Sequence, residues 1–216
     1  IRDCLLSRGL GDVYKRQLTM IASDGTAQAS HDVVVTVTGA NDLPTSSAGS
    51  DSTTEDTLVT FATSDFSFSD VDGDDSALAR IQITTLESSG TLECFNANGA
   101  GNAWANCAAD DYVTQGDYLR LTPASNSVAD VTFSFKVHDG TAYSAAAYVF
   151  TITVTAVNDA PANAGDTATA SEDVAYSGWT AATDWGYTDV DGDTMVSVTV
   201  KSLPSQGTLT CAGSAC

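Results

Sequence analysis

The sequence contains the pentapeptide Asp-Val-Asp-Gly-Asp twice, at residues 70–74 and 189–193. In an extended chain, residues i and i+2 point to the same side, so the first two carboxylates of each copy should lie together and Val71 should point the other way, into a core. The turn at the glycine should bring the third carboxylate close. Three like charges repel one another, and a hard cation with oxygen ligands relieves that repulsion. The predicted calcium ligands are therefore Asp70, Asp72, Asp74, Asp189, Asp191 and Asp193.

An EF-hand is the obvious alternative for a run of spaced aspartates. If Asp70 is counted as position 1, Asp75 falls at position 6, where the loop needs glycine, and Ile81 falls at position 12, where it needs glutamate. The second copy has Thr194 and Val200 at those positions. Neither copy is therefore an EF-hand.

The two pentapeptides belong to a longer repeat. They are 119 residues apart, and four further markers recur in the same order 117 residues apart. These markers are Asn41-Asp42 with Asn158-Asp159, Glu55-Asp56 with Glu172-Asp173, Gly90-Thr91-Leu92 with Gly207-Thr208-Leu209, and Cys94 with Cys211. Such a series indicates a tandem repeat. We expect a truncated repeat at residues 18–40, a complete repeat at 41–161 and a further truncated repeat at 162–216.

The first 17 residues do not fit this pattern. Residues 7–17, SRGLGDVYKRQ, are similar to the translation of a transposon-based sequencing adapter, and residues 1–3 fit the same adapter in another frame. We expect residues 1–17 to be non-native and exclude them from the fold, as a tag would be excluded. A short basic arm is the alternative. The remaining sequence should then be a fragment that is open at both ends.

The composition is strongly acidic. The chain has 28 acidic and eight basic residues and a formal net charge of −20, and without residues 1–17 the net charge becomes −22. Such a surface disfavours nucleic acid and anionic membranes as partners and favours cations. A solubilising acidic shell is the alternative, although the aspartates cluster at matching points of the repeat. The longest apolar run, residues 145–157, is too short for membrane insertion.

Apolar and polar residues alternate with a period of two through most of the complete repeat. The pattern is clearest at residues 131–138 and 148–154, and it recurs at residues 196–201. No stretch has a helical period. About seven such strands in roughly 100 residues predict an all-β fold of tandem immunoglobulin-like β-sandwich modules. Aromatic residues cluster ahead of both pentapeptides, and we expect them to pack in the core and in loops instead of forming a ligand platform. They are Phe61, Phe66, Phe68, Trp179, Trp185 and Tyr187.

The cysteines outside the foreign segment form one local pair in each repeat, after the Gly-Thr-Leu marker. This placement predicts hairpin-closing disulfides in an oxidising, extracellular setting. Zinc is the alternative, but the two pairs lie in different repeats and neither has a Cys-x-x-Cys spacing. The predicted disulfides are Cys94–Cys107 and Cys211–Cys216.

The segments VNDAP, SEDV, DVDGD, LPSQGTL and VHDGTA together resemble the bacterial cadherin-like tandem repeats, including VCBS repeats. These repeats occur in very long secreted adhesins, often of the RTX type, and the resemblance covers essentially residues 18–216. It implies cadherin-like β-sandwich modules in many copies, with neighbouring repeats of the same chain as partners and calcium at or near the joints. No glycine-rich nonapeptide calcium repeat occurs in the sequence.

The resemblance also implies further calcium ligands. Asn158-Asp159 resembles the centre of the cadherin linker Asp-x-Asn-Asp-Asn, with Ala156 and Ala160 in place of its first and last residues. Glu55 resembles the early glutamate that reaches the site at the far end of its own module. No Asp-Arg-Glu counterpart is evident, which implies fewer ions at each joint. The ligands added in this way are Asn41, Asp42, Glu55, Asn158, Asp159 and Glu172.

No nucleophile elbow, phosphate loop or zinc-protease motif occurs, and His31 and His138 are expected at exposed strand ends. We therefore expect a non-enzymatic, secreted or cell-surface adhesin segment that acts as a calcium-stiffened stalk. Two alternatives remain open. A ligand-binding module would contact a cell-surface glycan or protein through the 95–106 loop, with Trp104 exposed at its tip. A spacer in a large secreted hydrolase would accompany a catalytic domain outside this sequence.

Overall fold

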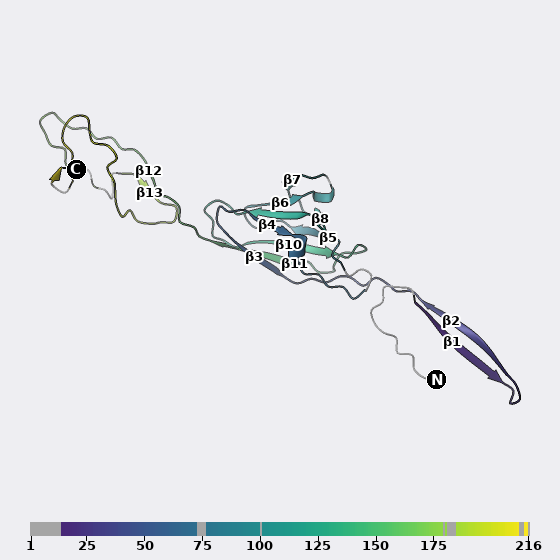
Figure 1. Ribbon diagram of the computed structural model, residues 1–216. Helices are drawn as coiled ribbons and strands as arrows, with labels where there is room; N and C mark the ends of the chain where they lie inside the picture. The colour runs from purple at the N-terminus through teal and green to yellow at the C-terminus, as the bar shows by residue number, and fades with distance from the viewer. Residues whose placement is uncertain are drawn as a thin grey trace. The chain divides into compact units, whose positions relative to one another are not determined.

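The computed structural model describes residues 14–72, 77–99, 101–178, 180, 185–211 and 214–215. The chain divides into two compact units, Ile1–Ala156 and Val157–Cys216. The first unit contains an N-terminal hairpin and a complete β-sandwich (Figure 1). Among the residues named above, Asp74, Asp75, Trp179 and Cys216 lie outside the described residues, as do residues 1–13.

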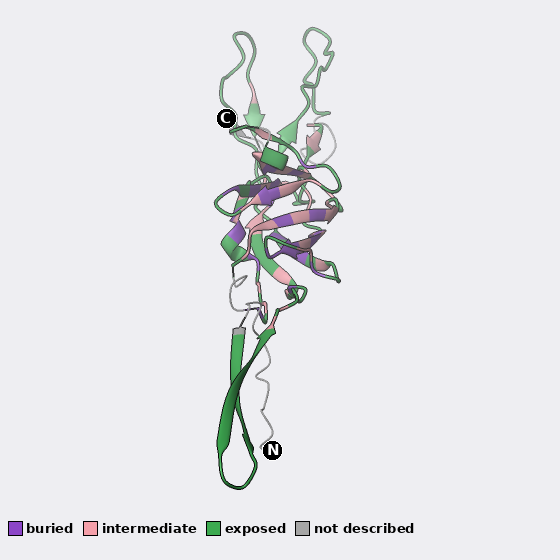
Figure 2. Cartoon of the chain, turned by 90° about the vertical axis from the view of Figure 1, so that its right-hand side faces the viewer, coloured by how far each residue is buried: buried purple, intermediate pink, exposed green. Residues whose placement is uncertain are grey.

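The N-terminal hairpin is a two-stranded sheet of β1 (Tyr14–Ser23) and β2 (Gln28–Val37). Its apolar residues are exposed, and Figure 2 shows the hairpin exposed along its length. β1 begins at Tyr14, inside the segment expected to be foreign, instead of at Leu18. The side chains of residues 15–17 are all exposed, so backbone pairing with β2 is what extends the strand there.

The β-sandwich consists of two sheets, with strand orders β3-β11-β10-β5-β8 and β4-β9-β6-β7. β3 is parallel to β11, and the other neighbouring strands pair antiparallel. The elements are β3 (Gly49–Thr54), β4 (Val59–Ala62), the 3-10 turn η1 (Thr63–Asp65), β5 (Arg80–Thr85), β6 (Thr91–Phe95), the 3-10 turn η2 (Ala97–Gly99), β7 (Trp104–Asn106), β8 (Tyr112–Thr114), β9 (Tyr118–Thr122), β10 (Val131–His138) and β11 (Tyr148–Thr155). The predicted all-β sandwich is confirmed. It has nine described strands instead of about seven, because the short strands β7 and β8 pair at the sheet edges.

Strand alternation generates the core between the two sheets, where Figure 2 shows the buried residues gathered. Phe66 lies 4.8 Å from Phe135 and 4.9 Å from Phe150 between ring centroids, and Phe133 stacks on Phe150 at 5.4 Å. Such aromatic pairs contribute about 0.5–1.5 kcal/mol each beyond the burial of their area. Phe61 is also fully buried, and Phe68 is partly buried against the same core. The expected packing of these three phenylalanines is therefore confirmed.

Two glycines are required by close approach in this sandwich. A Cβ at Gly49 would lie 2.5 Å from Cδ2 of Phe150, so the absence of a side chain lets β3 pack directly over that ring. Gly90 has a φ of +80°, and a Cβ there would lie 2.4 Å from the carbonyl oxygen of Thr122. Gly90 therefore allows β6 to start next to the end of β9.

Within the described residues, the second unit contains two short strand pairs, β12 (Ala162–Asn163) with β13 (Tyr187–Thr188) and β14 (Thr210–Cys211) with β15 (Ser214–Ala215). The strand expected at residues 196–201 is not formed, and Val196 is 95% exposed. A strand needs a partner for its backbone N–H and C=O groups. In the complete module β5 lies between β10 and β8, whereas no described strand pairs with residues 196–201.

Candidate metal sites

The linker residue Asp42 is bound to the first pentapeptide through its backbone. Its N–H donates to Oδ2 of Asp72 at 2.6 Å, and the N–H of Asp72 donates to Oδ1 of Asp70 at 2.8 Å. Asn41 adds a bond from its Nδ2 to the carbonyl oxygen of Asp42 at 2.6 Å. The linker and the Asp-x-Asp pair therefore form one hydrogen-bonded group at the start of the module.

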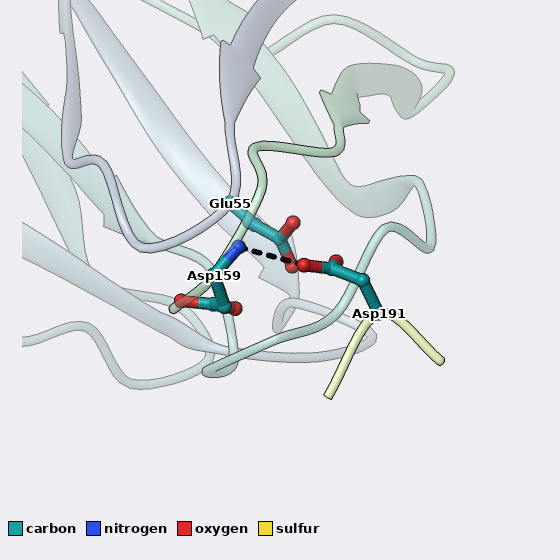
Figure 3. A group of neighbouring side chains, drawn as sticks. All are labelled: Glu55, Asp159 and Asp191. Carbon is teal, nitrogen blue, oxygen red and sulfur yellow. Dashed lines mark hydrogen bonds between the residues drawn. The ribbon is translucent and has the colours of Figure 1, made fainter. Parts of the chain in front are cut away.

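The second pentapeptide repeats this arrangement within the second unit. The N–H of Asp159 donates to Oδ2 of Asp191 at 2.6 Å, which Figure 3 shows as a dashed line. The N–H of Asp191 donates to Oδ1 of Asp189 at 3.0 Å, and Nδ2 of Asn158 donates to the carbonyl oxygen of Asp159 at 2.7 Å. The same three bonds thus occur at equivalent positions of two repeats, with nearly equal lengths.

Carboxylate oxygens come together in the second copy, as expected. Asp189, Asp191 and Asp193 each offer an oxygen, and these atoms all lie within 4.8 Å of one another. The N–H of Asp193 also donates to Oδ1 of Asp189 at 3.2 Å, which turns the chain back at Gly192. This is a set of oxygens of the kind that a hard cation prefers.

In the first copy, carboxylate oxygens of Asp70 and Asp72 are buried instead of being crowded together at the surface. Asp72 is 3% exposed, and Oδ2 of Asp70 is buried with no hydrogen-bond donor among the described residues. No cluster of three close carboxylates forms there within the described part of the chain, and the third predicted ligand, Asp74, lies outside it. A buried carboxylate oxygen without a donor is costly unless a cation or water satisfies it.

The prediction that Val71 points into a core is wrong. Val71 is 62% exposed, and its counterpart Val190 is equally exposed. In the first copy it is Asp72 that turns inward, because its carboxylate accepts the linker N–H of Asp42.

Asp139 is a candidate ligand that the sequence interpretation missed. Its side chain is buried, and Nδ2 of Asn41 donates to its Oδ2 at 3.2 Å. Its Oδ1 accepts the N–H groups of Thr141 and Ala142, both at 2.6 Å. Burial works to raise the pKa of the Asp139 carboxyl, but these two N–H groups, Asn41 and His138 outweigh it and lower the pKa. Asp139 is therefore a buried anion beside the linker.

A tetrapeptide of the N-terminal hairpin recurs at Asp139. Asp24-Gly25-Thr26-Ala27 matches Asp139-Gly140-Thr141-Ala142, 115 residues later. Oδ1 of Asp24 accepts the N–H groups of Thr26 and Ala27 at 2.8 and 2.7 Å, the same turn as at Asp139. The recurrence of this tetrapeptide could have placed Asp139 among the repeat's acidic positions.

The predicted glutamate ligands differ in their surroundings. Glu55 follows β3, is 4% exposed, and donates its N–H to the carbonyl oxygen of Thr155 at 2.9 Å. It therefore lies at the end of the module where the chain leaves β11 for the next linker. Glu172 is exposed in a segment without regular structure. The role of both as ligands stays a prediction.

The predicted disulfide between Cys94 and Cys107 is confirmed, with Cα atoms 5.2 Å apart. Cys94 lies in β6 and Cys107 follows β7, so the bond closes the β6–β7 hairpin, and both residues are buried. Cys211 is also disulfide-bonded. The predicted pairing of Cys211 with Cys216 falls on a residue outside the described part of the chain.

The expectations about three single residues are wrong, wholly for Trp104 and in part for His138, which ends β10 but is buried, and for His31, which is exposed but not at a strand end. Trp104 is not an exposed loop tip. It is half-buried at the start of β7, 5.3 Å from the ring of Phe95, with the guanidinium of Arg120 at 4.3 Å from its ring centroid. His138 is 6% exposed, because the ring of Tyr143 packs edge-on against it at 4.3 Å. His31 is exposed within β2 instead of at a strand end.

Among the described residues, the structure contains no helix long and apolar enough to cross a membrane.

The chain was compared with known proteins. No protein-family model and no curated protein matches it. Among solved structures it is similar to human protocadherin-24 EC1-2, with 14% identity, a TM-score of 0.32 and 67% of each chain covered. It is also similar to an endo-fucoidan hydrolase of glycoside hydrolase family 107, with 17% identity, a TM-score of 0.31, and 68% of this chain and 19% of that chain covered. Similarities at these TM-scores carry no argument about function, so the fold assignment depends on the two-sheet topology itself.

Proposed function

We propose that this chain is a non-enzymatic, calcium-binding repeat segment of a secreted or cell-surface adhesin, in which calcium stiffens a stalk of β-sandwich modules. The observation that carries the proposal is the repeated bond from the linker aspartate to the Asp-x-Asp pair, Asp42 to Asp72 and Asp159 to Asp191. A solubilising acidic surface would not need the same backbone-to-carboxylate geometry in two repeats.

The chemistry of these groups favours calcium. The close oxygens of Asp189, Asp191 and Asp193, and the buried oxygen of Asp70 without a donor, are hard ligands that carry negative charge. Calcium takes six to eight oxygens in a flexible geometry, whereas magnesium demands a near-ideal octahedron. Asn158 and Asp159 would add linker oxygens, and Asp139 would do the same beside Asn41. Glu55 and Glu172 are the ligands that the cadherin-like resemblance adds from the far end of each module.

The mechanical effect follows from where these groups lie along the chain. Without metal, a chain of net charge −20 has repelling carboxylates next to each linker, and this repulsion favours a flexible chain of modules. A bound ion would hold the linker residues Asn158 and Asp159 against the pentapeptide of the module that follows. Extracellular calcium modules bind at about 10⁻⁴–10⁻³ M. A hundredfold excess of calcium over the dissociation constant would stabilise the bound form by about 2.7 kcal/mol.

The remaining parts of the proposal concern setting and partners. The disulfide at Cys94–Cys107 suits an oxidising, extracellular location, where calcium is also abundant. The partners would be neighbouring repeats of the same chain and the cell-surface glycan or protein that the adhesin contacts. The acidic surface disfavours nucleic acid.

Calcium titration by calorimetry, together with small-angle scattering in calcium and in chelator, tests the proposal. We expect a heat of calcium binding with a dissociation constant of about 10⁻⁴–10⁻³ M, a stiffer and more extended chain in calcium than in chelator, and a much weaker response to magnesium. Asp189→Ala with Asp191→Ala should remove part of the heat while Cys94–Cys107 and the complete module remain intact. Absence of a calcium heat, together with unchanged scattering, would reject the stiffened-stalk function.

A further inference from the structure

The complete repeat has three basic residues, Arg80, Arg120 and Lys136, on a chain of net charge −20. Arg120 is neutralised, because its Nε and Nη2 donate to Glu93 at 2.7 and 2.9 Å. Its guanidinium also packs over the ring of Trp104. Arg80 and Lys136 form no ion pair with any residue in the described part of the chain. Two cations without an ion pair among the described residues of so acidic a module call for an explanation.

These two cations lie together on the outer face of the five-stranded sheet. In the β5–β10 register, Arg80 is opposite His138 and Gln82 is opposite Lys136. Side chains two residues apart in a strand share a face, and the neighbours Ile81, Ile83 and Val137 point into the core. Arg80 and Lys136 are therefore diagonal neighbours on adjacent strands, a separation of about 7–8 Å or less.

Two tyrosines hold Arg80 in place without neutralising it. Its Cζ lies 4.9 Å from the ring centroid of Tyr112 and 5.9 Å from that of Tyr143. Stacking on an aromatic ring restricts the guanidinium plane and leaves the N–H groups available to an oxyanion. Gln82 is opposite Tyr112 on β8 and adds an amide to the same surface. Arg80, Gln82, Tyr112, Lys136 and Tyr143 are named here the basic face.

The basic face is not part of the repeating pattern. Depending on whether the 117- or the 119-residue spacing is applied, Arg80 corresponds to Ser197 or Thr199 in the following repeat, and neither is charged. The pentapeptide, the linker and the glycine marker recur, whereas this cation does not. A feature that the common fold required would be expected in both repeats, so Arg80 distinguishes this module from the equivalent strand of the following repeat.

We propose that the basic face binds an acidic polysaccharide. Arg80 would bind a sulfate or carboxylate group bidentately, and Lys136 would bind a second such group along the chain. Gln82 and the tyrosine hydroxyls would hydrogen-bond sugar hydroxyls. This function goes beyond calcium stiffening, and none of the five residues is a predicted calcium ligand, so binding should persist in chelator.

One acid limits the affinity of this face. Oδ1 of Asp110 accepts a bond from Nε2 of Gln82 at 3.3 Å, which places a negative charge at the border of the basic face. Asp110 has a φ of +70°, a conformation that asparagine tolerates well. Asp110→Asn should therefore keep the backbone and remove the repulsion.

The test is binding of the full chain to immobilised dextran sulfate and to polygalacturonate, with neutral dextran as the uncharged control, in calcium and in chelator. Arg80→Gln and Lys136→Gln should each weaken binding about tenfold, as expected for loss of a charge-assisted hydrogen bond. Asp110→Asn should strengthen it several-fold. Lys201→Gln removes one exposed positive charge from the second unit and serves as the matched control, which should bind like the unmodified chain.

The two anionic polymers separate sulfate from carboxylate recognition, and binding to either one supports the proposal. No binding to either polymer, or equal weakening by Lys201→Gln, would overturn it. Tighter binding to poly-glutamate than to both polysaccharides would assign the face to an acidic peptide instead. If Arg80→Gln lowers the melting temperature, Lys136→Gln and Asp110→Asn still decide the outcome.

Discussion

The backbone N–H of Asp42 lies 2.6 Å from Oδ2 of Asp72, so a linker residue is held by a buried carboxylate of the module that it precedes. The equivalent bond from Asp159 to Asp191 has the same length. Because the geometry recurs although the two pentapeptides differ in burial, we regard it as a property of the repeat itself. The linker in each repeat therefore belongs structurally to the module on its C-terminal side.

Substitutions at Asp72 should separate metal binding from folding. Asp72→Asn keeps an oxygen that can accept the N–H of Asp42 but removes a charge, so calcium affinity should fall about tenfold or more while stability in chelator changes little. Asp72→Ala removes the acceptor as well and should lower the free energy of unfolding by about 1–3 kcal/mol. Asp51→Asn, on the exposed strand β3, is the control for loss of one charge. Equal calcium affinity in Asp72→Asn and Asp51→Asn would contradict a role for Asp72 as a ligand.

The disulfide at Cys94–Cys107 should contribute about 3 kcal/mol to the stability of the complete module, as the chain-entropy model gives for a loop of this length. Denaturant unfolding of Cys94→Ala with Cys107→Ala measures the loss. Non-reducing peptide mapping should recover Cys94 linked to Cys107 and Cys211 linked to Cys216. A Cys94–Cys211 peptide would refute pairing within each module.

Gly90→Ala should be strongly destabilising. The new Cβ would meet a backbone carbonyl oxygen at 2.4 Å in addition to the strain of a φ of +80°. Gly116→Ala is a matched control, because Gly116 has a φ of +95° but no atom within 4 Å of the added Cβ. We expect the control to cost about 1 kcal/mol and Gly90→Ala to cost more. Thermal or denaturant unfolding that ranks the two variants equally would show that the close contact is relieved at no cost.

The stability of the complete module should fall as the pH drops below about 6.5. Burial, followed by the charge of Arg80, lowers the pKa of His138 from its ordinary value of 6.5. The unfolded chain then binds more protons than the folded one below that pH, so the free energy of unfolding decreases until the folded pKa is reached. Melting temperatures between pH 7 and pH 5 in chelator measure this slope. His138→Gln should reduce the slope, whereas His31→Gln, at an exposed position, should leave it unchanged.

Deletion of residues 1–17 should leave the melting temperature of the complete module unchanged. The deletion removes residues 15–17, whose side chains are exposed, from a hairpin that forms its own two-stranded sheet. Circular dichroism during thermal unfolding compares the two chains. A drop of several degrees would show that the N-terminal segment supports the sandwich and would count against its adapter origin.

The sequence by itself determined the features that depend on local order along the chain. The recurrence of the pentapeptide predicted the repeat, and the alternation at residues 131–138 predicted the all-β sandwich. The cysteine pair after Thr91-Leu92 predicted the Cys94–Cys107 bond. Strand periodicity and a hairpin disulfide can be predicted in this way because they are set by near neighbours in the sequence. Only the tertiary structure decided which side chains are buried and what they contact. The side chain of Asp72 is buried and that of Val71 is exposed, because the carboxylate of Asp72 accepts the N–H of Asp42, 30 residues earlier. The carboxylate of Asp139 accepts a hydrogen bond from Asn41, 98 residues earlier in the sequence. Trp104 is half-buried because Phe95 and Arg120 pack against its ring. Residues 196–201 form no strand because no described strand pairs with them.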